Sequence, residues 1–119
     1  MDEAEKHYTA FVDSLVKDPV EIVEEMSPER ASIMHMSIGI SGEAGELLDA
    51  VKKHIIYGKP LDRDNIIEEL GDLEFYMAGL RSAIGVTRSQ VLLSNFDKLS
   101  ARYPSGYSDA AAQLRADKS

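Results

Sequence analysis

The sequence carries the stretch ISGEAGEL at residues 40–47 and repeats its pattern as IIEELGDL at residues 66–73. In each stretch one acid is followed three residues later by a second acid, with a glycine directly before the second. The four acids are Glu43, Glu46, Glu69 and Asp72. Because three residues make nearly one helical turn, each pair flanks the apolar stripe of its helix. The repeat therefore predicts two helices that carry the same acidic pattern.

The rest of the chain also favours helices. We expect them over residues 4–17, 28–57, from a cap at 62 or 64 to 84, and over 88–103, with a short further helix in the tail after residue 108. The form of the segment around residues 20–23 stays open. No segment has the alternation or the β-branched density of a strand. We therefore predict an all-α fold, a helical bundle in one domain over residues 1–119, in which the second and third helices form an antiparallel hairpin.

Residues with known helix-end preferences support these boundaries. Ser27 before Pro28 is typical of a helix start, and Gly58 to Pro60 of a helix stop. Gly85 is expected to end the third long helix, and Thr87 with Gln90 has the spacing of a capping box.

If the two apolar stripes pack against each other, both acidic pairs flank the same seam and can converge. Carboxylates that close together either raise one another's pKa or need a cation. Oxygen ligands without His or Cys favour Mg²⁺, with Mn²⁺ as a substitute, over zinc or copper. Gly45 and Gly71 each weaken their helix, so we expect either close helix approach there or room for a ligand.

Composition limits the remaining possibilities. The chain has 119 residues and no cysteine, which excludes disulfides, thiolate metal sites and cysteine nucleophiles. Its formal charge of −8 argues against nucleic acid as a partner. No signal peptide and no membrane-spanning run is seen, so we expect a cytoplasmic protein without a membrane partner. So short a chain has a small core, and a second subunit is expected to complete it.

The acidic pattern resembles the signature of the all-α nucleoside triphosphate pyrophosphohydrolases, which include the MazG-like proteins. A second block, NFDKLSARYP at residues 95–104, is similar to a segment of small single-domain MazG-like proteins. The resemblance implies a core built between two subunits, as a homodimer or homotetramer. It also implies that Glu43, Glu46, Glu69 and Asp72 bind magnesium, and that activated water attacks the α-phosphorus of a nucleoside triphosphate and releases pyrophosphate.

Several further residues are candidates for substrate binding. Asn95, Lys98 and Arg102 share one face of the expected last helix and can meet a phosphate. Lys52 follows Glu46 by less than two turns and can reach phosphate or metal-bound oxygens, with solvent exposure as the alternative. Tyr103 either stacks on a base or closes its helix.

His35 lies two turns before Glu43, where the resemblance places contacts to the base or ribose. A packed side chain is the alternative reading of this histidine.

Other functions stay open. A single pair of acids is usually a solvated helix face, so a non-catalytic helical interaction module is one alternative. Hydrolysis of phosphoribosyl-ATP or of an alarmone on the same fold is a second. A di-iron bundle needs Glu-x-x-His on two helices, and neither Glu43 nor Glu69 has His at that spacing.

Overall fold

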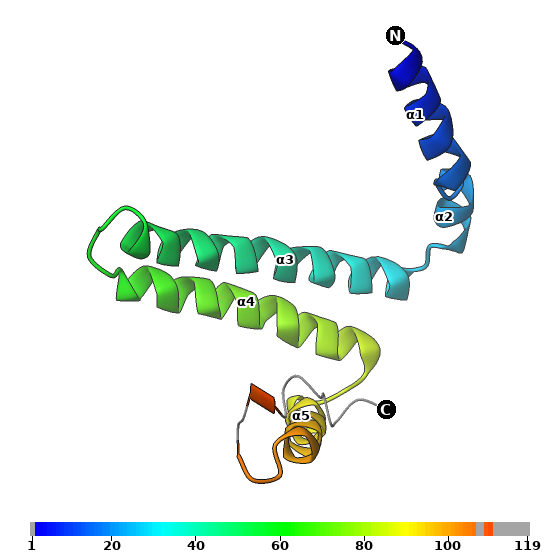
Figure 1. The fold of residues 1–119 in the computed structure, drawn as a ribbon. Coiled ribbons are helices and arrows are strands. Elements are labelled where there is room, and N and C mark those ends of the chain that lie inside the picture. Colours follow the sequence, from blue (N-terminus) through cyan, green and yellow to red (C-terminus); the bar gives the residue numbers. More distant parts are fainter. Residues whose placement is uncertain (1, 107–108, 111–119) are drawn as a thin grey trace. The chain divides into compact units, whose positions relative to one another are not determined.

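A computed structural model describes residues 2–106 and 109–110. It contains helices and no strand within those residues, which confirms the predicted all-α class (Figure 1). The helices are α1 (Glu3–Leu15), α2 (Pro19–Glu25), α3 (Pro28–Ile55), α4 (Arg63–Ile84) and α5 (Arg88–Arg102). The expected helix after residue 108 lies almost wholly outside the described residues.

The chain divides into two compact units, residues 1–31 and residues 32–119. The prediction of one domain over the whole chain stays a prediction. The first unit contains α1 and α2. The Asp18 carboxylate accepts a hydrogen bond from Val20 N at 2.9 Å, and Pro19 is the first residue of α2. The segment whose form was left open is therefore a separate short helix, because Asp-Pro supplies a cap and a preset first φ angle.

The second unit is built on the hairpin of α3 and α4, whose ribbons run side by side in opposite directions (Figure 1). The start of α3 is capped by Ser27, whose hydroxyl accepts from Arg30 N at 3.1 Å. Asp62, rather than Asp64, caps α4 by accepting from Asn65 N at 3.0 Å. Gly85 ends α4 with φ +74°, the left-handed conformation that glycine adopts without strain.

Helix α5 begins with the predicted capping box. The Thr87 hydroxyl accepts from Gln90 N at 3.1 Å, and the Gln90 side chain accepts from Thr87 N at 2.7 Å. The start of α5 borders an apolar hollow that α3 and α4 help to line, through Ile40, Met77 and Val91 among others. From Val91 onward to Ala101 every residue of α5 is exposed.

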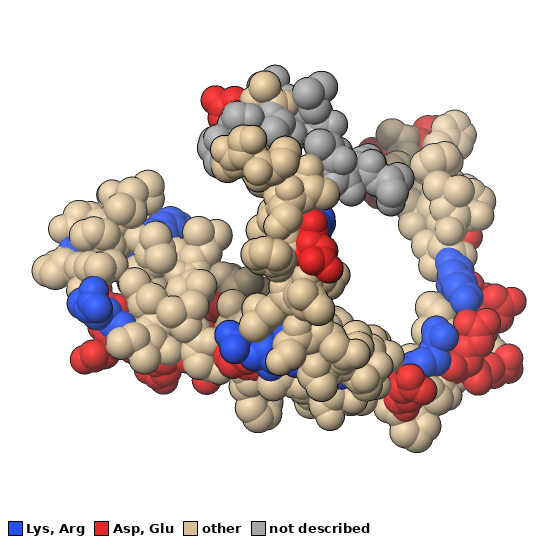
Figure 2. Space-filling view, turned by 90° about the horizontal axis from the view of Figure 1, so that it is seen from below, with Lys and Arg blue, Asp and Glu red and all other residues tan. Residues whose placement is uncertain are grey.

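The core is thin. Among the described residues, Ala50 alone is buried, with 6% of its surface exposed. Apolar side chains also lie exposed on the hairpin, including Ile38, Leu48, Ile67 and Phe75. In Figure 2 uncharged side chains make up most of the visible surface, and Lys and Arg occupy separate places on it. Within the described part of the chain, no helix is both long and apolar enough to cross a membrane.

Candidate metal centre

Three of the four predicted acids meet between α3 and α4. Glu43 from α3 and Glu69 and Asp72 from α4 each offer a carboxylate oxygen, and these oxygens lie within 4.8 Å of one another. Glu43 and Glu69 are half-buried, and Asp72 is exposed. Two oxygen ligands of one ion are at most about 5.2 Å apart for Ca²⁺ and about 4.2 Å apart for Mg²⁺, so these oxygens are close to the spacing of a shared cation, and Mg²⁺ would require the widest pair to close by at most about 0.6 Å.

The register of the hairpin explains why these acids meet. Gly39 faces Tyr76 and Gly79 faces Met36 across the helix pair. One turn further along each helix, this antiparallel register puts Glu43 opposite Asp72. After about one more turn it puts Glu46 opposite Glu69. Glu46 is exposed and lies outside the group of oxygens at ligand distance.

Electrostatics within the cluster act most clearly on Glu69. Partial removal from water raises the pKa of this carboxyl, and a hydrogen bond with the Glu43 side chain raises it further. Repulsion from the negative charges of Glu43, Asp72 and Glu46 adds to the upward pKa shift. Glu46 therefore contributes to the field of the site although it lies outside the closest group. A bound cation would offset this repulsion.

Aromatic side chains border the acids. Glu43, Asp72, Phe75 and Tyr76 line a pocket of about 350 Å³. The Tyr76 ring meets Phe75 edge to face, with ring centroids 5.2 Å apart. His35 is exposed and also lies edge-on to Tyr76, at 6.2 Å between centroids. The predicted base contact His35 thus touches the pocket wall through Tyr76.

The glycines beside the second acids do not mark close helix approach. A Cβ atom added to Gly45 or Gly71 would meet no other atom within 4 Å. The first of the two sequence-based alternatives is therefore wrong at these positions, and open space beside the acids is what the structure shows. Close approach occurs instead at Gly39, one turn before Glu43, because there the Tyr76 ring lies directly against the α3 backbone.

The predicted phosphate contacts lie outside the acidic group. The Lys52 ammonium lies over the Tyr57 ring, 5.5 Å from its centroid. Asn95 and Lys98 are exposed on α5, and the Arg102 guanidinium lies 5.9 Å from the Tyr103 ring centroid.

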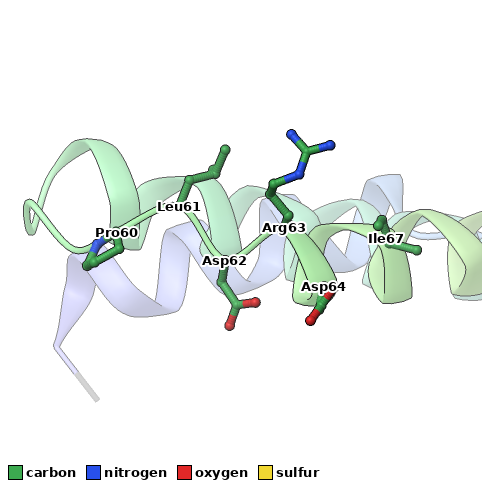
Figure 3. Close-up of a pocket in the computed structure, with 6 residues that line it drawn as sticks. All are labelled: Pro60, Leu61, Asp62, Arg63, Asp64 and Ile67. Atoms are coloured by element: carbon green, nitrogen blue, oxygen red, sulfur yellow. The ribbon is translucent and has the colours of Figure 1, made fainter.

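A second hollow, of about 550 Å³, lies at the start of α4 (Figure 3). In Figure 3 the Arg63 side chain points away from the carboxylates of Asp62 and Asp64. Asp62 already caps α4. None of the residues predicted to bind metal or substrate lines this hollow, so we do not assign the active site to it.

Sequence reasoning missed Gly39, Phe75 and Tyr76 as neighbours of the acids. Their spacing carried a usable signal, since Gly39 lies four residues before Glu43 and Tyr76 four residues after Asp72. Residues four apart are neighbours on one helix face. That Gly39 and Tyr76 touch each other follows only from the hairpin register.

Comparison with known proteins bears directly on this cluster. A family model described as the MazG nucleotide pyrophosphohydrolase domain matches residues 31–107, more than half of the chain, including all four predicted acids. The chain belongs to this family. The MazG match supports an enzyme that acts on nucleotides as a pyrophosphohydrolase.

One relative of the MazG domain is the Gene 37 protein of Mycobacterium phage L5. It is 35% identical to this chain over an alignment of 79 positions, and the alignment covers 62% of this chain and 68% of the relative. No solved structure gave a significant match.

Proposed function

We propose that this MazG domain hydrolyses ribo- or deoxyribonucleoside triphosphates to the monophosphate and pyrophosphate, with Mg²⁺ as its cofactor. The observation that carries the proposal is the group of carboxylate oxygens from Glu43, Glu69 and Asp72, within 4.8 Å of one another on two helices of a MazG chain. We also propose Glu46 as a ligand, since it faces Glu69 in the hairpin register and its charge reaches that residue.

The donor set fits the proposed metal. The ligand-distance group in the described residues contains carboxylates and neither His nor Cys. Hard cations such as Mg²⁺ and Mn²⁺ prefer oxygen ligands. Three acids held this close repel one another, and a divalent ion offsets that cost. The pKa of Glu69 is raised by partial burial first, then by the hydrogen bond with Glu43, and further by repulsion from the neighbouring carboxylates.

The reaction adds water to the α-phosphorus and breaks its bond to the oxygen that bridges to the β-phosphorus. When bound, the metal lowers the pKa of its water and offsets negative charge on the phosphates. The carboxylates of Glu43, Glu69 and Asp72 would hold the cation at the helix seam, and the phosphate chain would bind beside them there. Pyrophosphate leaves, and the nucleoside keeps one phosphate.

Side chains around the cluster are proposed to bind the rest of the substrate. His35 and Tyr76 stand beside the pocket that Glu43 and Asp72 line. We assign the phosphates to Lys52 and to the α5 residues Asn95, Lys98 and Arg102, and a base contact to Tyr103. Magnesium-dependent protection of these side chains by a nucleotide would support that assignment.

We further propose that the domain works as a homodimer or homotetramer. Hydrophobic side chains remain exposed on both helices of the hairpin, among them Leu48 at 67% and Ile67 at 62%. Large apolar side chains that remain exposed in this number on one helical hairpin are expected at a subunit interface. A second copy would bury it and complete the thin core.

The proposal is tested by hydrolysis in ¹⁸O-labelled water. The purified protein is incubated with Mg²⁺ and a panel of ribo- and deoxyribonucleoside triphosphates. The masses of the products are then measured by mass spectrometry. Attack at the α-phosphorus places ¹⁸O in the monophosphate and none in pyrophosphate. Orthophosphate as the first product, or label in pyrophosphate, would refute the proposed reaction.

A binding measurement separates the enzyme from a non-catalytic interaction module. A ligand that binds only the folded state stabilises it by about 2.7 kcal/mol at one hundred times its Kd. We expect Mg²⁺ or Mn²⁺ to raise the melting temperature of the wild-type protein. A protein whose acids are merely surface charges would show no such specific rise relative to a variant with neutral residues at the cluster.

A further inference from the structure

Near the acids, α3 and α4 approach each other closely at Gly39 and Tyr76. A Cβ atom on Gly39 would overlap three atoms of the Tyr76 ring, including Cγ at the root of the side chain. An atom so near the backbone cannot turn aside without moving α4 or changing the χ1 rotamer of Tyr76. The Tyr76 ring can therefore occupy its place only because residue 39 has no side chain.

This contact lies directly beside the metal cluster. Gly39 is one turn before Glu43 on α3, and Tyr76 is one turn after Asp72 on α4. The distance between the helices at the Gly39–Tyr76 contact therefore also sets their distance one turn further along, where Glu43 faces Asp72. Tyr76 also forms part of the pocket wall together with both acids.

Neighbouring aromatic side chains hold the Tyr76 ring in this place. Phe75 and His35 both meet it edge to face, with interplanar angles of 87° and 63°. Edge-to-face pairs of this kind are favourable because the positive edge of one ring meets the negative face of the other. Because the Tyr76 ring contacts α3, Phe75 and His35, it keeps one position between α3 and α4 and sets the distance between these helices.

The other glycines of the hairpin differ from Gly39. Gly42, Gly45 and Gly71 have open space where a Cβ would stand. A Cβ on Gly79 would meet the Met36 thioether, which lies toward the flexible end of its side chain. Gly39 is therefore the hairpin glycine at which an added methyl group meets a rigid obstacle, and the chain supplies its own controls.

We propose that Gly39 is a positioning residue for the metal centre. It admits the Tyr76 ring against α3 and so sets the helix separation at which Glu43 and Asp72 offer oxygens to one cation. This role rests on the proposed metal site but not on the proposed reaction. Metal sites demand ligand positions accurate to a few tenths of an ångström, so a small change in helix spacing weakens binding.

The test compares the Mn²⁺ affinity of Gly39→Ala with that of Gly45→Ala and Gly71→Ala, measured by titration of the free Mn²⁺ signal in electron paramagnetic resonance. We expect Gly39→Ala to weaken Mn²⁺ binding by about 10–100-fold, the range found for residues that orient metal ligands. Gly45→Ala and Gly71→Ala should bind Mn²⁺ within about twofold of wild type, because their methyl groups enter open space. Equal losses in all three variants, or none in Gly39→Ala, would overturn the proposal.

Rescue distinguishes positioning from a general loss of structure. In the double variant Gly39→Ala/Tyr76→Ala no Cγ remains to meet the added methyl group, so Mn²⁺ affinity should recover in part relative to Gly39→Ala. No recovery would contradict the spacer role.

A second pair of variants decides the matter even if Gly39→Ala does not fold. Tyr76→Phe keeps the ring and should bind Mn²⁺ like wild type, whereas Tyr76→Leu alone should bind it more weakly. Equal affinities of these two variants would overturn the role of the ring. Absence of Mn²⁺ binding by the wild-type protein would overturn the metal site together with this role, whereas wild-type binding that is also kept by Gly39→Ala would overturn the positioning role alone.

Discussion

At the scale of single residues, the pKa of Glu69 depends on its neighbours in the candidate metal centre. Its pKa is raised above the usual 4.5 by partial burial, by the hydrogen bond with Glu43 and by three nearby negative charges. A carboxyl whose pKa is higher in the folded than in the unfolded protein favours folding while it is protonated. That contribution is present below pH 4.5 and is lost as the pH rises through the folded-state pKa.

Glu69→Gln should therefore stabilise the metal-free protein at neutral pH, because the amide carries no charge and can still donate to Glu43. The gain in melting temperature over wild type should shrink as the pH falls through the raised folded-state pKa of Glu69 and should level off below pH 4.5. Calorimetric melts in a chelating buffer from pH 4 to 8 measure this difference. If the variant is less stable than wild type at pH 7 without metal, the charged form of Glu69 is not destabilised by its burial and its acidic neighbours as inferred.

Glu43 and Asp72 are predicted to be required for turnover and not for folding. Glu43→Gln or Asp72→Asn should lower Mg²⁺-dependent hydrolysis at least about 100-fold, the upper end of the losses seen for residues that only support metal ligands. Glu43 is half-buried, Asp72 is exposed, and neither belongs to the buried core, so helicity by circular dichroism should stay unchanged. Glu68→Gln, an exposed neighbour, is the control. Retained activity in both site variants would remove these acids from the mechanism.

At the scale of single elements, the helix ends follow local chemistry. Asp2, Asp18, Ser27, Asp62 and Thr87 each accept a hydrogen bond from a backbone N–H in the first turn that follows. The expected ends of the long helices lay within about two residues of those observed. The tail is the exception, because most of its expected helix lies outside the described residues.

The capping box of α5 gives a prediction at this scale. Thr87→Ala removes the hydroxyl that accepts from Gln90 N and should lower the free energy of unfolding by about 1 kcal/mol. Urea unfolding followed by circular dichroism measures the change. Ser89→Ala, on the exposed first turn of the same helix, should change stability by less than half as much. Equal effects of both variants would mean that the cap does not stabilise α5.

For the whole molecule, exposed apolar side chains on α3 and α4 predict assembly. The melting temperature should rise with protein concentration, and light scattering should give twice or four times the mass of one chain, because association stabilises the folded state by mass action. Leu48→Lys should lower the assembled fraction, while Leu48→Met, which keeps an apolar side chain, should not. A concentration-independent mass of one chain would contradict the proposed oligomer.

The sequence by itself determined the all-α class, the helices and their caps, because these depend on residues within a few positions of one another. It also placed Glu43, Glu69 and Asp72 on matching helix faces, since helical periodicity fixes direction around an axis. Only the tertiary structure decided which acids come within ligand distance and that the close contact is made at Gly39 and not at Gly45 or Gly71. Those outcomes depend on how far one helix slides along the other, and that register is set by side-chain packing between distant segments rather than by local sequence.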